Sequence, residues 1–418
     1  MKRFIRAAFT ICVLCLGLGA PGVAGPAEDA AAAFERGDFA TGIGVLRSMA
    51  EDGDATAQQN LGILYLKGYG LPRDEGEAMK WFRRAAAQDN AEAQYALGIA
   101  YARGTGLPKD LDQSLKWFRR AAALDHAGAW YGVGLAYDVG LGVQPDPAMA
   151  AKWYRKAAEQ GVVQAQFNLA VLYDEGRGVK QDQKLATKWF GKAADQGDAL
   201  AQYKMGFRYE SARGAPQDDA EAANWYRRAA EQGDAAGQNA LGTFYQDGRG
   251  VARDDAAALM WYRRAADQGN SSGQYHTGNM YYYGHGMPED PAEAAKWYRK
   301  AAEQDLSLAQ YSLGFMYDKG RGLPQDYAEA LKWYRLAAAQ NNPNAQNRLG
   351  LAYDNGLGTG RDHKEAVQWF RRAAQQDQVD GQYNLAVMYE MGRGVGQDYA
   401  QALTWHRKAA AQGYVKAQ

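Results

Sequence analysis

Five histidines are the residues of this chain best suited to metal ligation or proton transfer, and they are scattered along it. They are His126, His276, His285, His363 and His406. No two of them have the spacing that places zinc ligands on one helix face, and the chain has no H-E-x-x-H motif. His276 and His285 lie near Glu289 and Asp290 in sequence, but isolated histidines of this kind are more often surface residues. The histidines therefore predict no metal site.

Motifs for nucleophilic catalysis and phosphate binding are missing as well. The serines form neither S-x-x-K nor G-x-S-x-G. Gly-x-Gly segments recur along the chain, but none is followed by the Gly-Lys-Ser/Thr of a phosphate-binding loop, so they indicate turns. Both cysteines, Cys12 and Cys15, lie within an N-terminal apolar run. Because nothing converges as a catalytic site requires, we expect no enzymatic activity and no cofactor.

What the sequence does show is a repeat with a fixed period of 36 residues. Ten tryptophans follow this period: Trp81, Trp117, Trp153, Trp189, Trp225, Trp261, Trp297, Trp333, Trp369 and Trp405. Ten tyrosines, from Tyr65 to Tyr389, and ten aspartates, from Asp74 to Asp398, keep the same period. Three independent markers in one register, without an insertion, define ten repeats over residues 54–413.

The first half of each repeat is predicted to be a helix that ends at a glycine turn. In the repeat 90–125, Gln94, Leu97, Gly98 and Tyr101 share one helix face and are expected in the core. Gly98 would let the partner helix approach closely. Gly104 and Gly106 are expected to stop this helix, because glycine is suited to the left-handed backbone that closes a helix.

The second half is predicted to be another helix, which begins at an aspartate cap. Asp110 is the expected N-cap, and Gln113 three residues later completes a capping-box pattern. Trp117 and Phe118 are expected on its buried face, whereas the arginines that follow them are expected to point away. Since neither helix can bury its face alone, the repeats must stack. The predicted fold is an all-α solenoid of ten 36-residue helix-turn-helix repeats.

The two ends of the chain are expected to differ from the repeats. Lys2, Arg3 and Arg6 precede an apolar run and a small-residue cleavage site, so residues 1–24 are predicted to be a signal peptide. The run is too short to span a bilayer, and no transmembrane anchor is expected in the mature chain. Residues 25–53 are predicted to form an N-terminal capping helix pair. Residues 414–418 begin an incomplete eleventh repeat, so the chain is expected to continue or a partner to cover that end.

The repeat resembles a known family. The pattern A-x-Q-x-x-L-G-x-x-Y-x-x-G-x-G-x-x-x-D, followed by A-x-x-W-[FY]-R-[RK]-A-A-x-Q-G, is similar to the Sel-one-like repeat (SLR) family, a branch of the tetratricopeptide-like superfamily. The resemblance covers residues 54–413 and implies a non-catalytic interaction scaffold, such as an adaptor, an envelope-assembly factor or a periplasmic partner of signalling proteins. Some relatives are rich in cysteine and linked to β-lactam binding, but this chain lacks their cysteine pairs.

A solenoid usually binds along its concave face, which the first helices line. Three positions of each first helix, those of Tyr95, Ile99 and Ala102, are expected there. The first is mostly aromatic, the second mostly apolar, and the third acidic in six repeats. We therefore expect an aromatic groove with an acidic border, suited to a basic peptide or helix. Tyrosines half-buried in packing between repeats would explain the aromatic position equally well.

The central repeats depart most from the pattern and are expected to hold the most selective surface. The candidate partner-binding residues are Tyr203, Phe207, Glu210, Tyr275, Asn279, Tyr282, Tyr283, Tyr311, Phe315 and Asp318.

Two functions remain open at this stage. The first is a protein-interaction scaffold of the periplasm or the secreted space. The alternative is a glycan-binding module in exopolysaccharide export or cell-envelope assembly, because spaced tyrosines can stack on sugar rings and Asn239, Asn279 and Asn347 could bind hydroxyl groups. Basic and acidic residues number 48 each, so overall charge gives no reason to expect nucleic acid as a partner.

Overall fold

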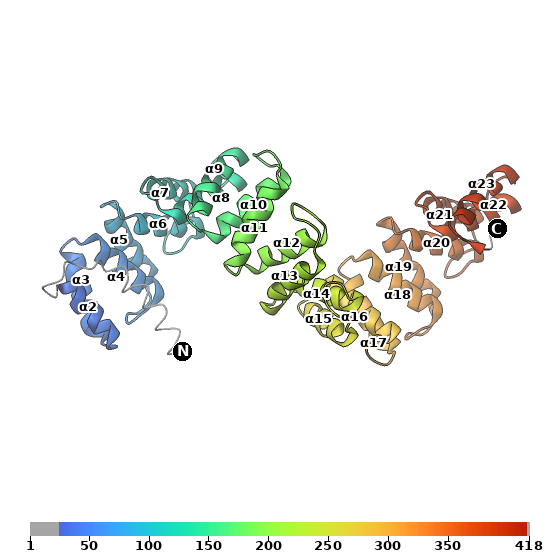
Figure 1. The fold of residues 1–418 in the computed structure, drawn as a ribbon, viewed down its shortest axis with the longest axis horizontal. Helices are drawn as coiled ribbons and strands as arrows, with labels where there is room; N and C mark the ends of the chain where they lie inside the picture. Colours follow the sequence, from blue (N-terminus) through green and yellow to red (C-terminus); the bar gives the residue numbers. More distant parts are fainter. Residues whose placement is uncertain (1–24, 416–418) are drawn as a thin grey trace. The chain divides into compact units, whose positions relative to one another are not determined.

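The structure is built from consecutive antiparallel helices (Figure 1). The computed structural model describes residues 25–415, and within them it contains 22 helices and no strand. The predicted signal peptide and the last three residues lie outside the described part. The chain divides into two compact units, the first ending at residue 201 with 213–215 added, the second comprising 202–212 and the residues from 216 onward.

The helices before residue 211 are α2 (Pro26–Glu35), α3 (Phe39–Glu51), α4 (Ala55–Lys67), α5 (Glu75–Ala86), α6 (Ala91–Arg103), α7 (Leu111–Ala123), α8 (Ala127–Val139), α9 (Pro147–Glu159), α10 (Val163–Glu175), α11 (Gln183–Asp195) and α12 (Ala199–Glu210). Those after it are α13 (Asp219–Glu231), α14 (Ala235–Asp247), α15 (Asp255–Asp267), α16 (Ser271–Tyr283), α17 (Pro291–Ala302), α18 (Ser307–Lys319), α19 (Tyr327–Ala339), α20 (Pro343–Asn355), α21 (His363–Gln375), α22 (Val379–Met391) and α23 (Tyr399–Ala411). The solenoid of 36-residue helix pairs is thus confirmed. A further pair, α2 and α3, precedes the repeats and packs on α4.

The turn between the two helices of a repeat follows the predicted chemistry, with one correction. Gly104 closes α6 in the left-handed conformation, with φ of 76°. The carboxylate of Asp110 accepts a hydrogen bond from the backbone N–H of Gln113 at 2.9 Å, so Asp110 is the N-cap. The backbone N–H of Asp110, however, donates to the carbonyl of Tyr101 at 2.9 Å. In a capping box this N–H would instead donate to the side chain of Gln113. The turn therefore has the predicted N-cap without the second bond of a capping box.

A buried glutamine ties most of the first helices to the repeat before them. Gln94 has no exposed surface, and its Nε2 donates to the carbonyl of Ala86 at 3.1 Å. In other repeats the equivalent glutamine likewise donates to the carbonyl of the residue eight positions before it. This hydrogen bond explains why a polar side chain is tolerated in the core. Trp130 replaces this glutamine in one repeat and keeps the bond, because its Nε1 donates to the carbonyl of Ala122 at 3.0 Å.

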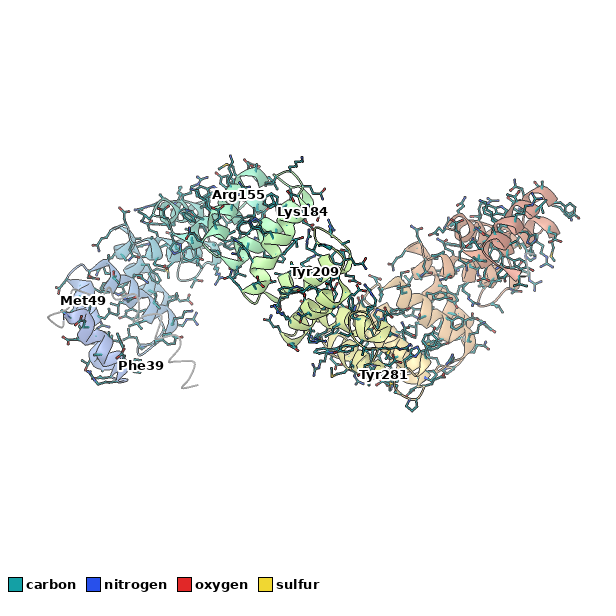
Figure 2. All side chains as sticks on the ribbon, viewed as in Figure 1. Phe39, Met49, Arg155, Lys184, Tyr209 and Tyr281 are labelled. Atoms are coloured by element: carbon teal, nitrogen blue, oxygen red, sulfur yellow. The ribbon has the colours of Figure 1, made fainter. Side chains whose placement is uncertain are left out.

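The predicted core face is correct for most positions. In the repeat 90–125, Leu97 and Phe118 are buried, whereas Tyr101 and Trp117 are half-buried. The equivalent tryptophan is buried in five other repeats, as at Trp261, but the tyrosine is half-buried in most of them. The Tyr101 hydroxyl accepts a hydrogen bond from Arg83 of the preceding repeat at 3.4 Å. Equivalent pairs link other repeats, for example Arg263 and Tyr281, which is labelled in Figure 2, at 2.8 Å. This position therefore links neighbouring repeats at the surface.

The basic residues of the second helices do not simply point away from the molecule. The guanidinium of Arg120 lies over the ring of Trp117, 4.7 Å from its centroid, and Arg264 lies over Trp261 at 4.6 Å. A lysine covers the tryptophan in several other repeats, as Lys300 covers Trp297 at 4.0 Å. These exposed cations form cation–π contacts and shield the partly exposed indoles from water. Leu336 stands at the corresponding position in one repeat and is 48% exposed.

Candidate functional site

The aromatic position of the first helices packs within its own repeat. Tyr203 lies 5.7 Å from the ring of Tyr226, and Tyr275 lies 5.8 Å from that of Tyr298, between centroids. Tyr311 meets the Tyr334 ring in the same way, at 5.9 Å. Each of these first-helix tyrosines is half-buried. Each ring is therefore positioned by packing and keeps part of its surface exposed.

The seventh repeat, residues 270–305, is one of the central repeats that depart from the pattern. It has less exposed surface than its sequence suggested. Contrary to expectation, Tyr282 is buried, with 8% of its surface exposed, because the guanidinium of Arg321 covers its ring at 4.0 Å. The side chain of Asn279 accepts a hydrogen bond from the Tyr298 hydroxyl at 2.7 Å. Tyr283, by contrast, is 58% exposed. Of the residues particular to this repeat, Tyr283 is the one with most surface to offer a partner.

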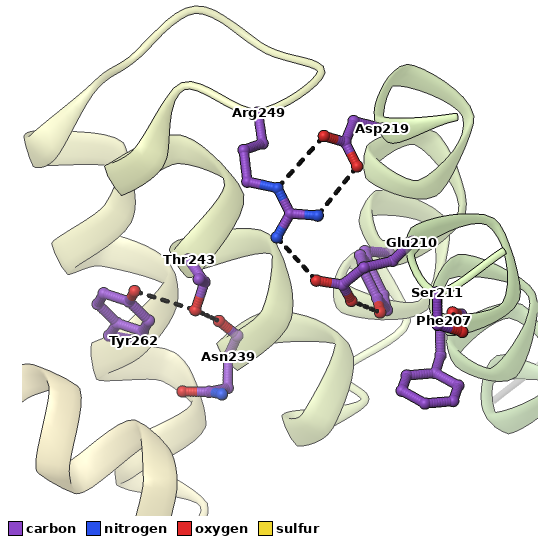
Figure 3. Close-up of polar contacts among 9 residues, drawn as sticks. Phe207, Glu210, Ser211, Asp219, Asn239, Thr243, Arg249 and Tyr262 are labelled. Atoms are coloured by element: carbon purple, nitrogen blue, oxygen red, sulfur yellow. Dashed lines mark hydrogen bonds and ion pairs between the residues drawn. The ribbon is translucent and has the colours of Figure 1, made fainter. Parts of the chain in front are cut away.

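Three of the six acids on the first helices, Asp138, Asp174 and Glu210, pair with arginines that the sequence analysis overlooked. Arg249, in the turn after α14, donates to Glu210 at 2.8 Å and to Asp219 at 2.9 Å (Figure 3). Glu210 also accepts a hydrogen bond from the buried hydroxyl of Tyr226 at 2.6 Å. Burial, together with this carboxylate, raises the pKa of Tyr226 and keeps the phenol protonated. The expected acidic border is therefore a set of internal ion pairs at this point.

The same pairing recurs in two earlier repeats. Arg177 pairs with Asp138, and Arg213 lies 3.4 Å from Asp174. Each arginine follows its acid by 39 residues, from the turn of the next repeat. The 39-residue spacing is a sequence signal for this pairing, but it is not sufficient, since Asp354 and Arg393 have the same spacing and Asp354 contacts His363 instead, at 2.7 Å.

At Asp318 the turn arginine is missing from the sequence, and a pocket lies beside this residue. Its turn position carries Leu357 in place of arginine, and a cavity of about 150 Å³ opens there, lined also by Tyr334 and Leu351. Asp318 is 9% exposed and accepts from the Tyr334 hydroxyl at 3.3 Å. Arg348, which enters from the next first helix, lies 3.8 Å from the same carboxylate. Arg348 is therefore farther from the Asp318 carboxylate than Arg249 is from Glu210.

Replacing Arg249 by lysine is expected to destabilise the second unit by about 1–2 kcal/mol, because an ammonium group cannot bond Glu210 and Asp219 with the geometry of a guanidinium. Denaturant unfolding followed by circular dichroism measures the loss. Arg253, whose side chain is exposed and pairs only with the nearby Asp255, is the matched control, and its lysine variant should lie within about 0.5 kcal/mol of the wild type. Equal losses would contradict the bridging role of Arg249.

The histidines serve local structure. The Nδ1 of His126 accepts from the backbone N–H of Ala129 at 3.0 Å and caps α8, while its Nε2 lies 3.2 Å from Glu92. His363 lies 2.7 Å from Asp354. Across residues 25–415, no three histidine, cysteine or acidic side chains gather as ligands for a metal ion.

His276 should make the second unit less stable in acid. Its ring stacks on Tyr262 at 4.8 Å and meets Tyr275 edge-on. Burial lowers the pKa of His276, and Asp247 only partly opposes this. Below the ordinary histidine pKa the unfolded chain therefore binds a proton that the folded chain resists, so stability falls as pH falls, by at most about 1.4 kcal/mol per pH unit.

The test is the difference in unfolding free energy between wild type and His276→Asn, measured from pH 7.5 to 5. Asparagine occupies the equivalent position in three other repeats, as Asn60, Asn168 and Asn384, and should be accommodated. The wild type should lose more stability than the variant over this range. Parallel curves would show that His276 titrates alike in both states.

The fold and its repeating turn contacts place the chain among tetratricopeptide-like helical-repeat proteins. The Sel1 repeat model matches ten consecutive segments: 55–90, 91–126, 129–162, 163–198, 199–234, 235–270, 271–306, 307–342, 343–378 and 379–414. The chain belongs to the Sel1 repeat family. Proteins of this family are generally non-catalytic scaffolds for protein interactions.

Two solved structures are similar over most of the chain. Protein c5321, a protective antigen of uropathogenic Escherichia coli with an SLR fold, is 34% identical, and the match covers 90% of this chain and 88% of that one with a TM-score of 0.68. A Sel1 repeat protein from Oxalobacter formigenes is also 34% identical, with 75% of this chain and 90% of that one covered and a TM-score of 0.57. A search of curated proteins gave no match.

Proposed function

We propose that this chain is a non-catalytic scaffold of the cell envelope or the secreted space, and that it binds a protein partner along the face formed by its first helices. The observation that carries the proposal is the exposure of large aromatic side chains on that face. Phe207 is 39% exposed and Tyr283 is 58% exposed. Aromatic side chains are enriched at protein interfaces, where they supply contact area at low entropic cost. Half-buried Tyr203, Tyr275, Tyr311 and Phe315 extend the same face.

Export is supported by two observations. The basic and apolar N-terminal leader has the composition of a signal peptide. Protein c5321, which is 34% identical to this chain, is a protective antigen, and this favours a location outside the cytoplasm. No helix within residues 25–415 is long and apolar enough to cross a membrane. N-terminal sequencing of the protein from fractionated cells should find Gly25, or a close neighbour, at the start of an exported chain; a cytoplasmic chain that begins at Met1 would contradict the proposal.

The glycan alternative finds little support in the side chains that first suggested it. Asn279 accepts from Tyr298, as described above. Asn347 is 5% exposed and accepts a hydrogen bond from Asn384 at 2.9 Å. The side-chain oxygen of Asn239 is buried. Because these amides are turned inward, they do not flank exposed rings as a sugar-binding surface requires.

Site-specific crosslinking tests which face binds. A photoreactive benzoylphenylalanine placed at Phe207 or Tyr283 should capture a protein in the native cells. The matched control is the same residue at Met260 or Leu336, which are apolar and exposed to 42% and 48% on second helices. Adducts with one protein from the first-helix positions alone are expected. Equal capture from both faces, or none from the first helices, would contradict the proposed face.

A further inference from the structure

In the turn between the two helices of a repeat, one residue lies between two glycines, as Arg249 lies between Gly248 and Gly250. We call its place the turn position. The side chain at this position determines whether the space beside the first helix of the preceding repeat is filled. Arg249 reaches back to Glu210, as shown in Figure 3. Arg321 reaches back to Tyr282, donates to its carbonyl at 3.1 Å and covers its ring. In both cases the guanidinium lies beside the residue of the preceding repeat that is equivalent to Ala102, namely Glu210 or Tyr282. A leucine at the turn position is too short and too apolar to make these contacts.

Leucine stands there at residue 141, and a second pocket lies beside it. Its volume is about 180 Å³, larger than the cavity beside Leu357. Phe118, Leu115 and Leu135 line it together with Leu141. Apolar cavities of about 150 Å³ are large enough to hold benzene. The Leu141 pocket therefore has the size and the lining for one aromatic side chain.

The charge at this pocket has one sign. Ala102 stands where the next three repeats have an acid (Asp138, Asp174 and Glu210), and Arg103 is the charged residue in the lining. Arg103 is exposed and has no carboxylate within 4.0 Å among residues 25–415. The hydroxyl of Ser114 is already used, since it donates to the carbonyl of Gly98 at 2.7 Å. On the far side of Tyr95, Glu92 is paired with His126. The rim of the pocket therefore favours a negative group.

We propose that the Leu141 pocket binds an aromatic side chain of the protein partner that has a carboxylate next to it, and that leucine rather than arginine at the turn position opens the pocket. The aromatic ring packs on Phe118, and the carboxylate pairs with Arg103. This inference rests on the proposed binding of a protein along the first helices. It also replaces the basic ligand expected from the sequence with an acidic one at this point of the face.

A small-molecule probe tests the pocket without knowledge of the partner. The probe is 3-phenylpropionate, its neutral control is 3-phenylpropanamide, and binding is followed by ligand-observed NMR. All chains carry Leu357→Arg to close the pocket beside Leu357, so that binding reports on the Leu141 pocket alone. This chain should bind the acid at millimolar concentration, and adding Leu141→Arg should abolish binding. Equal binding by the two chains, both folded by circular dichroism, would overturn the proposal while leaving the crosslinking result untouched.

Two further variants guard against loss of folding in the arginine variant. Arg103→Ala should weaken binding of the acid about three- to five-fold and leave the amide unaffected. The pair Asp138→Ala and Arg177→Leu copies the Ala102–Leu141 combination into the next repeat and should create an added binding site. Because Val139 stands there in place of Arg103, that site should not distinguish acid from amide. An acid preference that persists without Arg103, or no gain from the copied pair, would overturn the assignment.

Discussion

Replacing Trp261 by alanine should lower the free energy of unfolding of the second unit by about 3–5 kcal/mol. Trp261 is 7% exposed and belongs to one buried cluster with Tyr226 of the preceding repeat and with Leu241 and Phe244 of its own. Its removal leaves a cavity between two repeats, and Arg264 loses the ring that it covers. Because a repeat array is held together by contacts between neighbours, the loss should be felt on both sides of the cavity.

The matched control is the adjacent residue on the same helix. Met260 is also large and apolar, but it is 42% exposed, so Met260→Ala should change stability by less than about 0.5–1 kcal/mol. Denaturant unfolding gives the two free energies, and hydrogen exchange read by mass spectrometry locates the change. Exchange in α13, α14 and α15 should rise in the tryptophan variant. Similar losses for both variants would mean that the burial of Trp261 contributes little.

The helix pairs were predictable from the sequence because the residues that define them are local and repeated. Asp110 and Gly104 act within a few residues of their own position, and the 36-residue period shows ten times which face of each helix is buried. The N-cap was correct in every repeat from Asp74 to Asp398. The partner of its backbone N–H was not, since the Tyr101 carbonyl that accepts it is brought there by the turn and has no side-chain marker.

The candidate surface was less predictable because its contacts join different repeats. A row of acids along the first helices indicated a negative border, yet Arg249 and Arg177, each 39 residues beyond its acid, neutralise it. Tyr282 was expected to contribute binding surface, but Arg321 covers it from the next turn. Helical periodicity assigns a residue to a face of its own helix and carries no information on what a neighbouring turn places over that face. Comparing equivalent positions across repeats supplies this information, as the pairs Asp138–Arg177 and Ala102–Leu141 show.

The second glycine of the turn should be far less replaceable than the first. Gly250 has φ of 62°, in the left-handed region, and a Cβ added to it would overlap the carbonyl of Asp219 at the start of α13. All ten repeats have glycine at this place: Gly70, Gly106, Gly142, Gly178, Gly214, Gly250, Gly286, Gly322, Gly358 and Gly394. Alanine would bear the cost of the left-handed backbone, about 1–2 kcal/mol, and that of displacing a helix end, about 1–3 kcal/mol. Gly250→Ala should therefore destabilise the second unit by about 2–5 kcal/mol.

Gly248, two residues earlier, is the matched control, because alanine there would meet the cost of the left-handed backbone without the displacement of a helix end. It has φ of 68°, but the nearest atom to an added Cβ would be the side-chain Cβ of Arg253, at 3.2 Å. Ala212 already occupies the equivalent position one repeat earlier, with φ of 54°. Gly248→Ala should therefore cost only the backbone term, about 1–2 kcal/mol. Denaturant unfolding measures both losses. If they were equal, the close approach of Gly250 to Asp219 would not restrict the residue at this position. Backbone conformation alone would then explain why every repeat has glycine at the position of Gly250.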